Sequence, residues 1–597
     1  MKTVLHPRTI TLFPPIVLLA GLAAAQGSEA PQRSPLGEKP NRTVLVPEHE
    51  AGILEVKFVH GSGVRLVQER FQGSADGLDA VDAYLDSVDA VRHRLFAQPD
   101  GWLEAWRLSG ELASGRALHD LTLFYRITLE GPTALVAEVC DALNAFDVVE
   151  LAYPIGRVED ATAAVMVAPA GSGTPDFEAL QGYRRAAPLG IDADYGQTFS
   201  GSHGQGTTIA EVETGWTDDH EDIAHAAEGN YIGLAPLHYP WNHGTAVLGE
   251  LVGDDNGFGV RGIVYEADVL LSTHQGSGAN IPTAVANAAA AVGPGDVVVI
   301  EAQCFGTPPS PFPCEFVAST FATIETATAN GIHVFAAAGN GNVNLDGAAF
   351  GGAFDRDIRD SGAFIIGASD GSSLNKASFS NYGSRLDAHG WGSTVTTAGY
   401  GDLFGAGSPV ELREYTATFS GTSSATPIVT GAGIMLNGIY RGAYGTNLDP
   451  FALRDLVTLT GTPQGTGGQI GPRPDVRAAI AQLGIPRIAV AGNLVPGGSY
   501  TVTHTGDAGD LYVICFSPEF LLSPIQIPPY GSLYLGSPFF RIQTGVLSAS
   551  GEASYSASIP NDGTLAGTTI GYYESWQRFQ SGPGGGTFTN YVPIEVQ

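Results

Sequence analysis

The sequence predicts a multidomain protein built around an α/β unit, in which a parallel sheet carries helices on both faces. Strand-like apolar runs alternate with helical runs from about residue 208 to residue 367, and this alternation is typical of parallel sheets. The chain has 597 residues, whereas a single hydrophobic core stops growing at roughly 250–300 residues. We therefore expect further domains on either side of the α/β unit.

The N-terminus has the order of a secretory signal peptide. Lys2 and Arg8 precede an apolar stretch that ends in three alanines, Ala23 to Ala25, which is the small-residue pattern of a cleavage site. Prolines interrupt the stretch, and crossing a bilayer takes about 20 apolar residues. We expect residues 1–25 to be removed, the protein to be secreted and extracellular, and the mature form to have no membrane segment.

An α+β domain is expected at residues 26–170. After a polar leader, residues 121–129 and 148–152 have the pattern of strands, and residues 133–145 have that of an amphipathic helix. Residues 168–178 are mostly small. Such a linker is a natural place for a domain boundary or a proteolytic cut.

The α/β unit is expected at residues 176–484. Helical runs at 282–292 and 317–329 separate some of its strands, and functional side chains in such sheets lie at the carboxyl ends of the strands. From 485 to 597, short strands between Gly, Pro and Asp turns predict a C-terminal β-sandwich. The buried strands expected in the α/β unit are 208–212, 268–272, 296–300, 332–336 and 364–367.

Acidic residues outnumber basic ones by 61 to 29, which gives a formal net charge of −32. Binding to nucleic acid relies on clustered Lys and Arg, so we expect no nucleic-acid partner. Apolar residues make up 43% of the chain, which is too many for a disordered acidic polymer.

Two of the four cysteines, Cys304 and Cys314, flank a proline-rich loop and are expected to pair. Four cysteines allow three pairings, and the sequence does not choose among them. Cys140 and Cys515 fall in different predicted domains and are expected to be buried free thiols. No Cys-X-X-Cys or His-Glu-X-X-His spacing occurs, so no catalytic metal is predicted.

Four groups of complementary chemistry stand at the ends of predicted elements. Ser423 precedes a helical run, where unpaired N–H groups and the helix dipole favour a nucleophile that forms an oxyanion. His243 opens another helical run, Glu213 ends the first strand of the α/β unit, and Asn340 follows a later strand. A serine at a helix start is most often only a cap, so the catalytic hypothesis rests on the combination.

Residues from about 180 to 480 resemble the catalytic domain of the subtilisin-like serine proteases, the subtilases. The acid, histidine and serine follow the family's order, and the resemblance implies a serine endopeptidase that forms an acyl-enzyme on Ser423. It implies His243 as general base and acid, Glu213 as the group that orients it, and Asn340 as an oxyanion donor. Protein or peptide substrates, a monomer and no required cofactor are also implied. The matching stretches are 212–223, 243–249, 338–340, 377–383 and 421–427.

The resemblance has implications for substrate binding and activation. Residues 26–170 are expected to be a leader and inhibitory pro-region, with an activating cut between 160 and 178. Two strands are expected to flank an extended substrate through Gly276, Ser277, Gly278, Ala302 and Gln303.

Two departures from the family pattern leave alternatives open. Glu213 stands where the family usually has Asp, and the extra methylene moves the carboxylate by roughly an ångström, an error that costs ~10²-fold in rate. Nearby Glu211 and Asp218 are possible substitutes. The alternatives are a catalytically weak subtilase-fold binding protein and a sedolisin-like acid peptidase, which pairs Ser with Glu and has Asp at the oxyanion position. The second departure, residues 389–392, has no catalytic interpretation.

A structural calcium site is a further hypothesis. Asp254, Asp255 and Asn256 lie in a Gly-bounded loop and offer the oxygen ligands that Ca²⁺ prefers, and calcium is common in the family. The alternative is a solvated loop without an ion.

Overall fold

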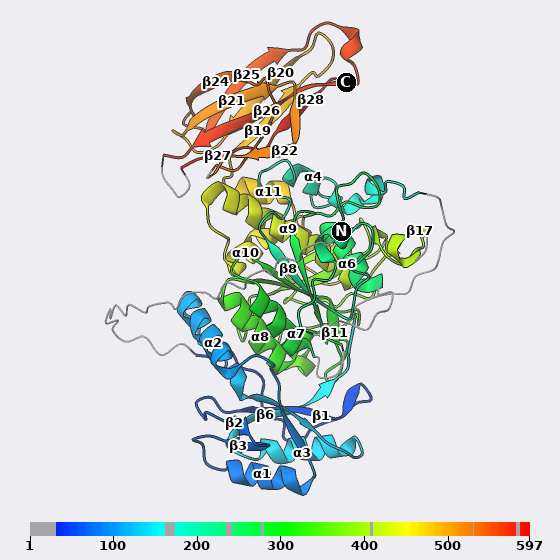
Figure 1. The fold of residues 1–597 in the computed structure, drawn as a ribbon, viewed down its shortest axis with the longest axis vertical. Coiled ribbons are helices and arrows are strands. Elements are labelled where there is room, and N and C mark those ends of the chain that lie inside the picture. Colours follow the sequence, from blue (N-terminus) through cyan, green and yellow to red (C-terminus); the bar gives the residue numbers. More distant parts are fainter. Residues whose placement is uncertain are drawn as a thin grey trace, which may run out of the picture.

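The computed structural model describes residues 32–160, 173–233, 242–275, 280–405, 410–528, 530–580 and 585–597. Three domains lie in a row, with the α/β domain in the middle (Figure 1). The expected signal peptide, residues 1–25, lies outside the described residues. Within the described parts, no helix combines the length and apolar character needed to cross a bilayer.

The N-terminal domain is an antiparallel sheet of order β4-β5-β1-β6, with α1 and α3 packed on one face (Figure 1). Its predicted strand 121–129 starts instead as a single 3₁₀ turn, because the Asp120 carboxylate accepts a hydrogen bond from the Thr122 N–H at 3.0 Å. The elements are β1 (His49–Phe58), β2 (Arg65–Val67), β3 (Arg70–Gln72), α1 (Leu78–Ser87), β4 (Val91–Arg94), α2 (Asp100–Ser114), β5 (Phe124–Thr128), α3 (Ala134–Asn144), β6 (Val149–Gly156) and β7 (Val158–Asp160).

The central domain contains a six-stranded sheet of order β15-β14-β13-β10-β8-β9. Every neighbouring pair is parallel, which confirms the predicted α/β class. All residues of β10 and β13 are buried, as expected for strands covered on both faces. The strands are β8 (Thr208–Glu213), β9 (Asp268–Thr273), β10 (Val297–Ile300), β13 (His333–Ala337), β14 (Phe364–Ser369) and β15 (Ala388–Trp391).

Helices cover both faces of this sheet and give it two hydrophobic cores. α7 and α8 contribute to one core, and α6 and α9 to the other. A small antiparallel sheet of order β16-β18-β17 and the strand β11, which pairs with β12, complete the domain. These elements are α4 (Ala193–Gly196), α5 (Ala224–Ala227), α6 (Asn242–Val252), α7 (Ile281–Ala291), β11 (Ala302–Cys304), β12 (Phe312–Pro313), α8 (Ala318–Ala329), β16 (Val395–Ala398), β17 (Phe404–Gly405), β18 (Glu414–Phe419), α9 (Thr422–Tyr444), α10 (Pro450–Thr460) and α11 (Val476–Gln482).

The C-terminal domain is antiparallel throughout its described pairings and has one core shared by two sheets. The sheets have the orders β19-β20-β25 and β24-β21-β26-β27, with β28 on β26. Alternate residues of β20 are buried, as in a strand with one face on a core. The strands are β19 (Arg487–Gly492), β20 (Ser499–Thr505), β21 (Leu511–Ser517), β22 (Phe520–Gln526), β23 (Ser532–Leu535), β24 (Phe540–Val546), β25 (Glu552–Ser558), β26 (Thr569–Arg578), β27 (Thr587–Phe588) and β28 (Val592–Glu595).

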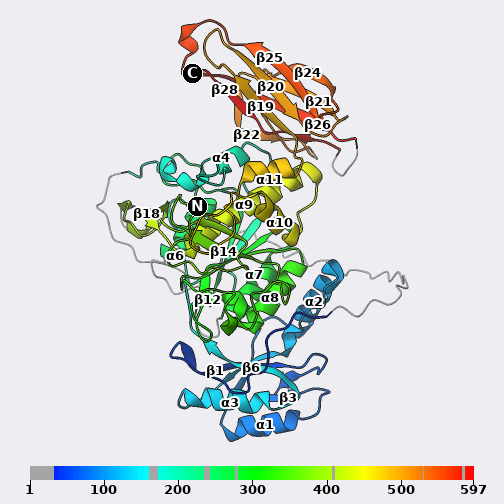
Figure 2. The ribbon, with the colours of Figure 1, turned by 180° about the vertical axis from the view of Figure 1, so that it is seen from behind.

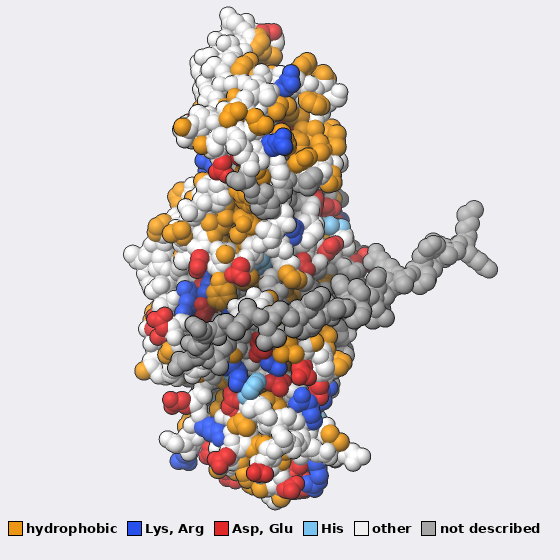
Figure 3. Space-filling view, turned by 90° about the vertical axis from the view of Figure 1, so that its left-hand side faces the viewer, with side chains coloured by type: hydrophobic (Ala, Val, Ile, Leu, Met, Phe, Trp, Pro, Cys, Tyr) orange, Lys and Arg blue, Asp and Glu red, His pale blue; other side chains and the backbone are white. Residues whose placement is uncertain are grey.

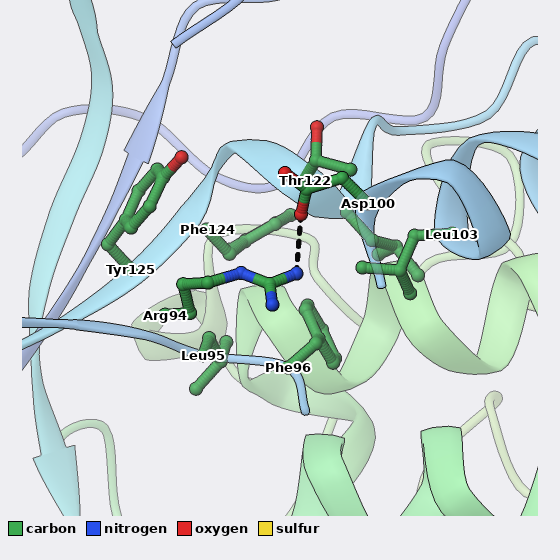
Figure 4. Close-up of a pocket in the computed structure, with 9 residues that line it drawn as sticks. Arg94, Leu95, Phe96, Asp100, Leu103, Thr122, Phe124 and Tyr125 are labelled. Atoms are coloured by element: carbon green, nitrogen blue, oxygen red, sulfur yellow. Dashed lines mark hydrogen bonds and ion pairs between the residues drawn. The ribbon is translucent and has the colours of Figure 1, made fainter. Parts of the chain in front are cut away.

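The N-terminal domain is docked on the central domain through α2, which lies beside α8 in both ribbon views (Figures 1 and 2). Trp106 of α2 and Phe321 of α8 belong to one core, and the Asn330 side chain donates to the Trp106 carbonyl at 3.0 Å. A shallow hollow near the start of α2 is bridged by the ion pair of Arg94 and Asp100 (Figure 4). The hollow therefore belongs to the packing of this domain.

The predicted disulfide between Cys304 and Cys314 is present, and Cys140 and Cys515 are free thiols. Cys140 is buried and Cys515 is only partly buried. On the face shown in Figure 3, charged side chains of both signs are dense on the N-terminal domain and sparse on the C-terminal domain. Lys and Arg are interspersed with Asp and Glu there, so this face has no continuous basic surface.

Candidate active site

A buried acid–histidine pair lies at the carboxyl ends of the strands of the central sheet. Glu213 is the last residue of β8, and His243 is in the first turn of α6. Glu213 Oε2 lies 2.6 Å from His243 Nδ1, and its other oxygen accepts a hydrogen bond from the Thr214 N–H. Burial and the nearby Asp160 carboxylate raise the pKa of Glu213, whereas burial lowers the pKa of His243. The contact fixes the imidazole and leaves Nε2 without a hydrogen-bond partner among the described residues.

The longer acid is accommodated by a glycine. A Cβ atom at position 244 would lie 2.7 Å from Cγ of Glu213 and 2.6 Å from the carbonyl oxygen of Gly215, and both distances are shorter than real carbon contacts. The bare backbone of Gly244 therefore lets α6 lie against the glutamate stem. The other acids near this strand do not substitute for it, because Glu211 accepts from the Trp216 indole and Asp218 from the N–H of Gly229.

Ser423 is the second residue of α9 and is fully buried. Gly421, just before the helix, has a φ of 112°, a left-handed conformation that favours glycine. The Phe419 ring packs edge-on to the His243 ring at a centroid distance of 5.7 Å, so the serine segment runs beside the histidine. The sequence predicts that Ser423 precedes the helix, whereas α9 already begins at Thr422. Ser423 therefore lies in its first turn, where backbone N–H groups lack helical partners.

Asn340 follows β13 and faces the start of α9. Its Oδ1 atom accepts hydrogen bonds from the N–H and hydroxyl of Thr422 at 2.9 and 3.1 Å. Its amide nitrogen is buried and has no partner among the described residues. A buried donor left unpaired costs about 1–3 kcal/mol, and the same side chain binds Thr422, the residue just before the predicted nucleophile. The geometry suits an oxyanion that forms during reaction.

The predicted substrate residues are described only in part. Ala302 and Gln303 lie in β11, and the Gln303 side chain accepts from the Asn340 N–H at 2.9 Å. β7 of the N-terminal domain pairs antiparallel with β11 and so occupies this edge. The other three predicted residues, Gly276, Ser277 and Gly278, lie outside the described residues.

Residues 204–467 match the subtilase family model. The chain contains a subtilase domain. Savinase, a subtilisin of Lederbergia lenta, is 27% identical over 238 residues, which are 40% of this chain and 78% of its own. The alkaline protease of Alkalihalobacillus alcalophilus is 27% identical over 238 residues, and the chain spans only 55% of its length. The solved structure of fervidolysin from Fervidobacterium pennivorans, a keratinolytic enzyme related to subtilisin, has a TM-score of 0.49 and 15% identity over 90% of this chain and 80% of its own.

Sequence reasoning missed several polar groups around the subtilase site. Asp160 and His274 lie beside the acid–histidine pair, at 3.3 Å from each other. Glu250 and Glu301 are fully buried. Burial and the Glu211 carboxylate raise the pKa of Glu301, and the nearby Ser423 side chain opposes this. The sequence did carry a signal for Glu301, because this acid lies within the apolar run Val297–Ala302. Protein interiors rarely bury an unpaired carboxylate, so an acid in such a run indicates an unusual site.

The loop predicted to bind calcium, residues 254–256, is not among the groups of described residues whose ligand atoms lie close enough to hold an ion. Asn256 donates to Asp222 at 2.9 Å and accepts from the N–H of Phe258, so its side chain is engaged in loop hydrogen bonds. In the described parts of the chain, the group whose ligand atoms lie close enough to hold an ion is Asp160, Glu213 and His274, within 4.8 Å of one another. Glu213 already binds His243 there, so this cluster belongs to the site itself.

The segment at 389–392 has a structural role in the subtilase domain. His389 is buried, and its Nδ1 lies 2.7 Å from the carbonyl oxygen of Gly471. A Cβ atom at position 390 would lie 2.5 Å from the carbonyl oxygen of Ala425. Gly390 therefore allows β15 to approach the first turn of α9, which holds Ser423 in place.

Proposed function

We propose that this protein is a secreted serine endopeptidase that hydrolyses peptide bonds through an acyl-enzyme on Ser423. The proposal is carried by the 2.6 Å contact between Glu213 and His243, which supplies the oriented base that serine catalysis needs. The serine at the start of α9 and the unpaired Asn340 amide supply the nucleophile and an oxyanion donor.

In this mechanism Ser423 Oγ attacks the peptide carbonyl while His243 Nε2 accepts its proton. Glu213 holds the proton on Nδ1 and stabilises the imidazolium that forms. The carbonyl oxygen becomes an anion that accepts hydrogen bonds from the Asn340 amide and the Ser423 N–H. Removing the side-chain oxyanion donor costs about 10²–10³ in turnover in subtilisin. His243 then gives its proton to the leaving amine, and water releases the acyl group by the reverse route.

The N-terminal domain is proposed to be an inhibitory pro-region, residues 26–170. β7 covers β11, and the Asp160 carboxylate contacts His274 and lies within 4.8 Å of the Glu213 carboxyl. A substrate strand needs the same edge, so the two exclude each other. We expect activation by a cut between 160 and 178, and N-terminal sequencing of active protein should show a start within this range. A start near residue 26 would contradict the zymogen.

A histidine-based mechanism fits the site better than the acid chemistry of the sedolisins. His243 is held by Glu213, and an amide, Asn340, takes the position at which sedolisins have an aspartate. The glutamate therefore acts through the histidine.

A fluorophosphonate probe tests the proposed function directly. Protein secreted by cells that express the full chain should be labelled at Ser423, and Ser423→Ala should abolish labelling. Ser424→Ala is a matched control, because Ser424 bonds the backbone of Trp391 and Gly421 instead. Absence of label in processed, folded protein would refute the enzyme and favour a binding role.

A further inference from the structure

The last described strand of the N-terminal domain lies where an extended peptide substrate is expected. β7 and β11 pair antiparallel with Asp160 opposite Ala302, and the Phe305 N–H donates to the Arg157 carbonyl at 3.0 Å. Adding a strand to a sheet edge is a common way to bind an extended peptide. The side chains of this strand therefore indicate what the adjacent subsites accept.

Asp160 directs its carboxylate at two polar side chains of the central domain, Thr214 and His274, and it also lies near the Glu213 carboxyl, whose pKa it raises. Its Oδ1 atom accepts a hydrogen bond from the Thr214 hydroxyl at 2.6 Å and lies 3.3 Å from His274 Nε2. Thr214 Oγ1 and His274 Nε2 are themselves 3.4 Å apart. Both partners are buried. Burial would raise the pKa of Asp160, but the His274 hydrogen bond and the nearby His243 lower it below its ordinary value.

The two partners are held in place without Asp160. The His274 N–H donates to the Glu213 carbonyl at 3.0 Å, and the Thr273 hydroxyl donates to the Thr214 carbonyl at 2.8 Å. These contacts tie the ends of β8 and β9 together. The donors are thus built into the central sheet and remain after the N-terminal domain leaves.

We propose that Thr214 and His274 form a substrate subsite that selects an aspartate side chain beside the Glu213–His243 pair. The inference rests on the proposed function and names its substrate class, peptides with an acidic residue at this subsite. An apolar side chain here would leave two buried polar groups unpaired, which is costly. A lysine would find both Glu213 oxygens already engaged by His243 and the Thr214 N–H.

The test uses quenched peptides with the sequence of residues 157–160, Arg-Val-Glu-Asp, followed by mixed residues. The aspartate is replaced by Asn, Ala or Lys, and kcat/KM is measured with protein secreted from full-chain expression. The Asp peptide should exceed the Ala peptide by about 10–100-fold, as expected for hydrogen bonds to a charged group. The readout is this ratio within each variant, so a general loss of activity does not affect it.

Variants assign the preference to the two side chains. His274→Ala and Thr214→Val should each bring the Asp-to-Ala ratio toward one, and His274→Gln, which keeps a donor, should retain part of it. His333→Ala is the matched control, because His333 is also a buried histidine but is the first residue of β13, at the opposite end of the strands from the site. Its ratio should equal that of the wild type.

Two outcomes would overturn the inference. A ratio near one in wild-type protein whose Ser423 still reacts with fluorophosphonate would refute the subsite and leave the proposed function standing. Loss of the preference in EDTA would show that a metal ion, held by Asp160, Glu213 and His274, is the selective element. If no peptide is cleaved and Ser423 is not labelled, the proposed function fails and the subsite with it.

Discussion

Two clusters of buried ionisable residues in the central domain have opposite electrostatic environments. Beyond β14, Arg385 donates two hydrogen bonds to Glu315, at 2.7 and 2.9 Å, and one to Asp387 at 2.6 Å. Beside the candidate site, Glu250 and Glu301 are just as buried, yet neither forms an ion pair with an arginine or lysine of the described residues. Burial raises the pKa of both glutamates well above the usual range.

The difference shows how this domain distributes its negative charge. A carboxylate that faces an arginine is stable as an ion, whereas one in an apolar interior keeps its proton. Neutral acids near Glu213 add little repulsion to its charge. Glu250 and Glu301 therefore add no negative charge near the Glu213–His243 pair, whereas Asp160, whose pKa is lowered, adds one while the N-terminal domain is docked.

The largest expected effect comes from Glu213, the acid with a histidine partner. Glu213→Ala should lower kcat by about 10⁴, a loss of the size seen when the acid of a serine protease triad is removed. Glu213→Gln has nearly the same shape and should lose almost as much, because a neutral amide does not stabilise the imidazolium. Steady-state kinetics on a peptide substrate measures both. An alanine variant with unchanged kcat would remove Glu213 from the mechanism.

The sequence predicted the fold, and it indicated four candidate site residues, because these features are local. Long apolar runs such as 296–300 identify buried strands, and Glu213, His243, Asn340 and Ser423 stand at the ends of such runs or of helices. That Glu213 and Asn340 lie on the same side of the sheet followed from the architecture, since the carboxyl ends of parallel strands meet there.

The features that the sequence did not predict depend on contacts between segments far apart in the chain. Asp160 reaches the site only because β7 adds to β11, which no local pattern indicates. The early start of α9 depends on the Asn340 side chain, which caps the N–H of Thr422 from 82 residues away. Glu250 directly follows the motif at residues 243–249, and nothing in the local sequence indicates that it is buried. Its burial is seen only in the packing of α6.

The second prediction concerns the paired cluster. Arg385→Met should lower the free energy of unfolding by about 3–5 kcal/mol, because it leaves Glu315 buried without its ion-pair partner and removes one of the arginines that pair with Asp387, which keeps Arg356. Urea unfolding followed by fluorescence measures the change. The matched control is Arg477→Met, since the Arg477 side chain is 56% exposed in its pair with Asp192 and should cost at most about 1 kcal/mol. Equal losses of unfolding free energy in the two variants would show that the buried ion pairs contribute no more to stability than the exposed one.

The third prediction concerns stability against pH at Glu250. Its folded pKa is raised above the ordinary 4.5, so the folded protein keeps a proton that the unfolded chain has released. The associated stability is full below about pH 4.5 and is lost as pH rises toward the folded pKa, by about 1.4 kcal/mol per pH unit. Glu250→Gln should flatten this slope between pH 5 and 8, measured by urea unfolding, whereas Glu228→Gln at an exposed position should not. An unchanged slope would show that Glu250 is ionised in the fold.

The smallest effect is expected at Glu301. Its substitution tests whether this residue is a neutral neighbour of Ser423 or a general base. If Glu301 is protonated in the resting protein, Glu301→Gln replaces a neutral group by another of similar shape, and kcat at pH 6 should stay within about threefold, well below the 10²–10⁴-fold effect of a general base. The pH profile of kcat between pH 6 and 9 distinguishes the two cases. A neutral Glu301 predicts that the glutamine variant keeps its activity to higher pH, because no charge then develops beside the serine. A fall of 10² or more at pH 6 would instead make Glu301 an ionised partner of Ser423, and the contrast with the arginine-paired cluster would no longer hold at this position.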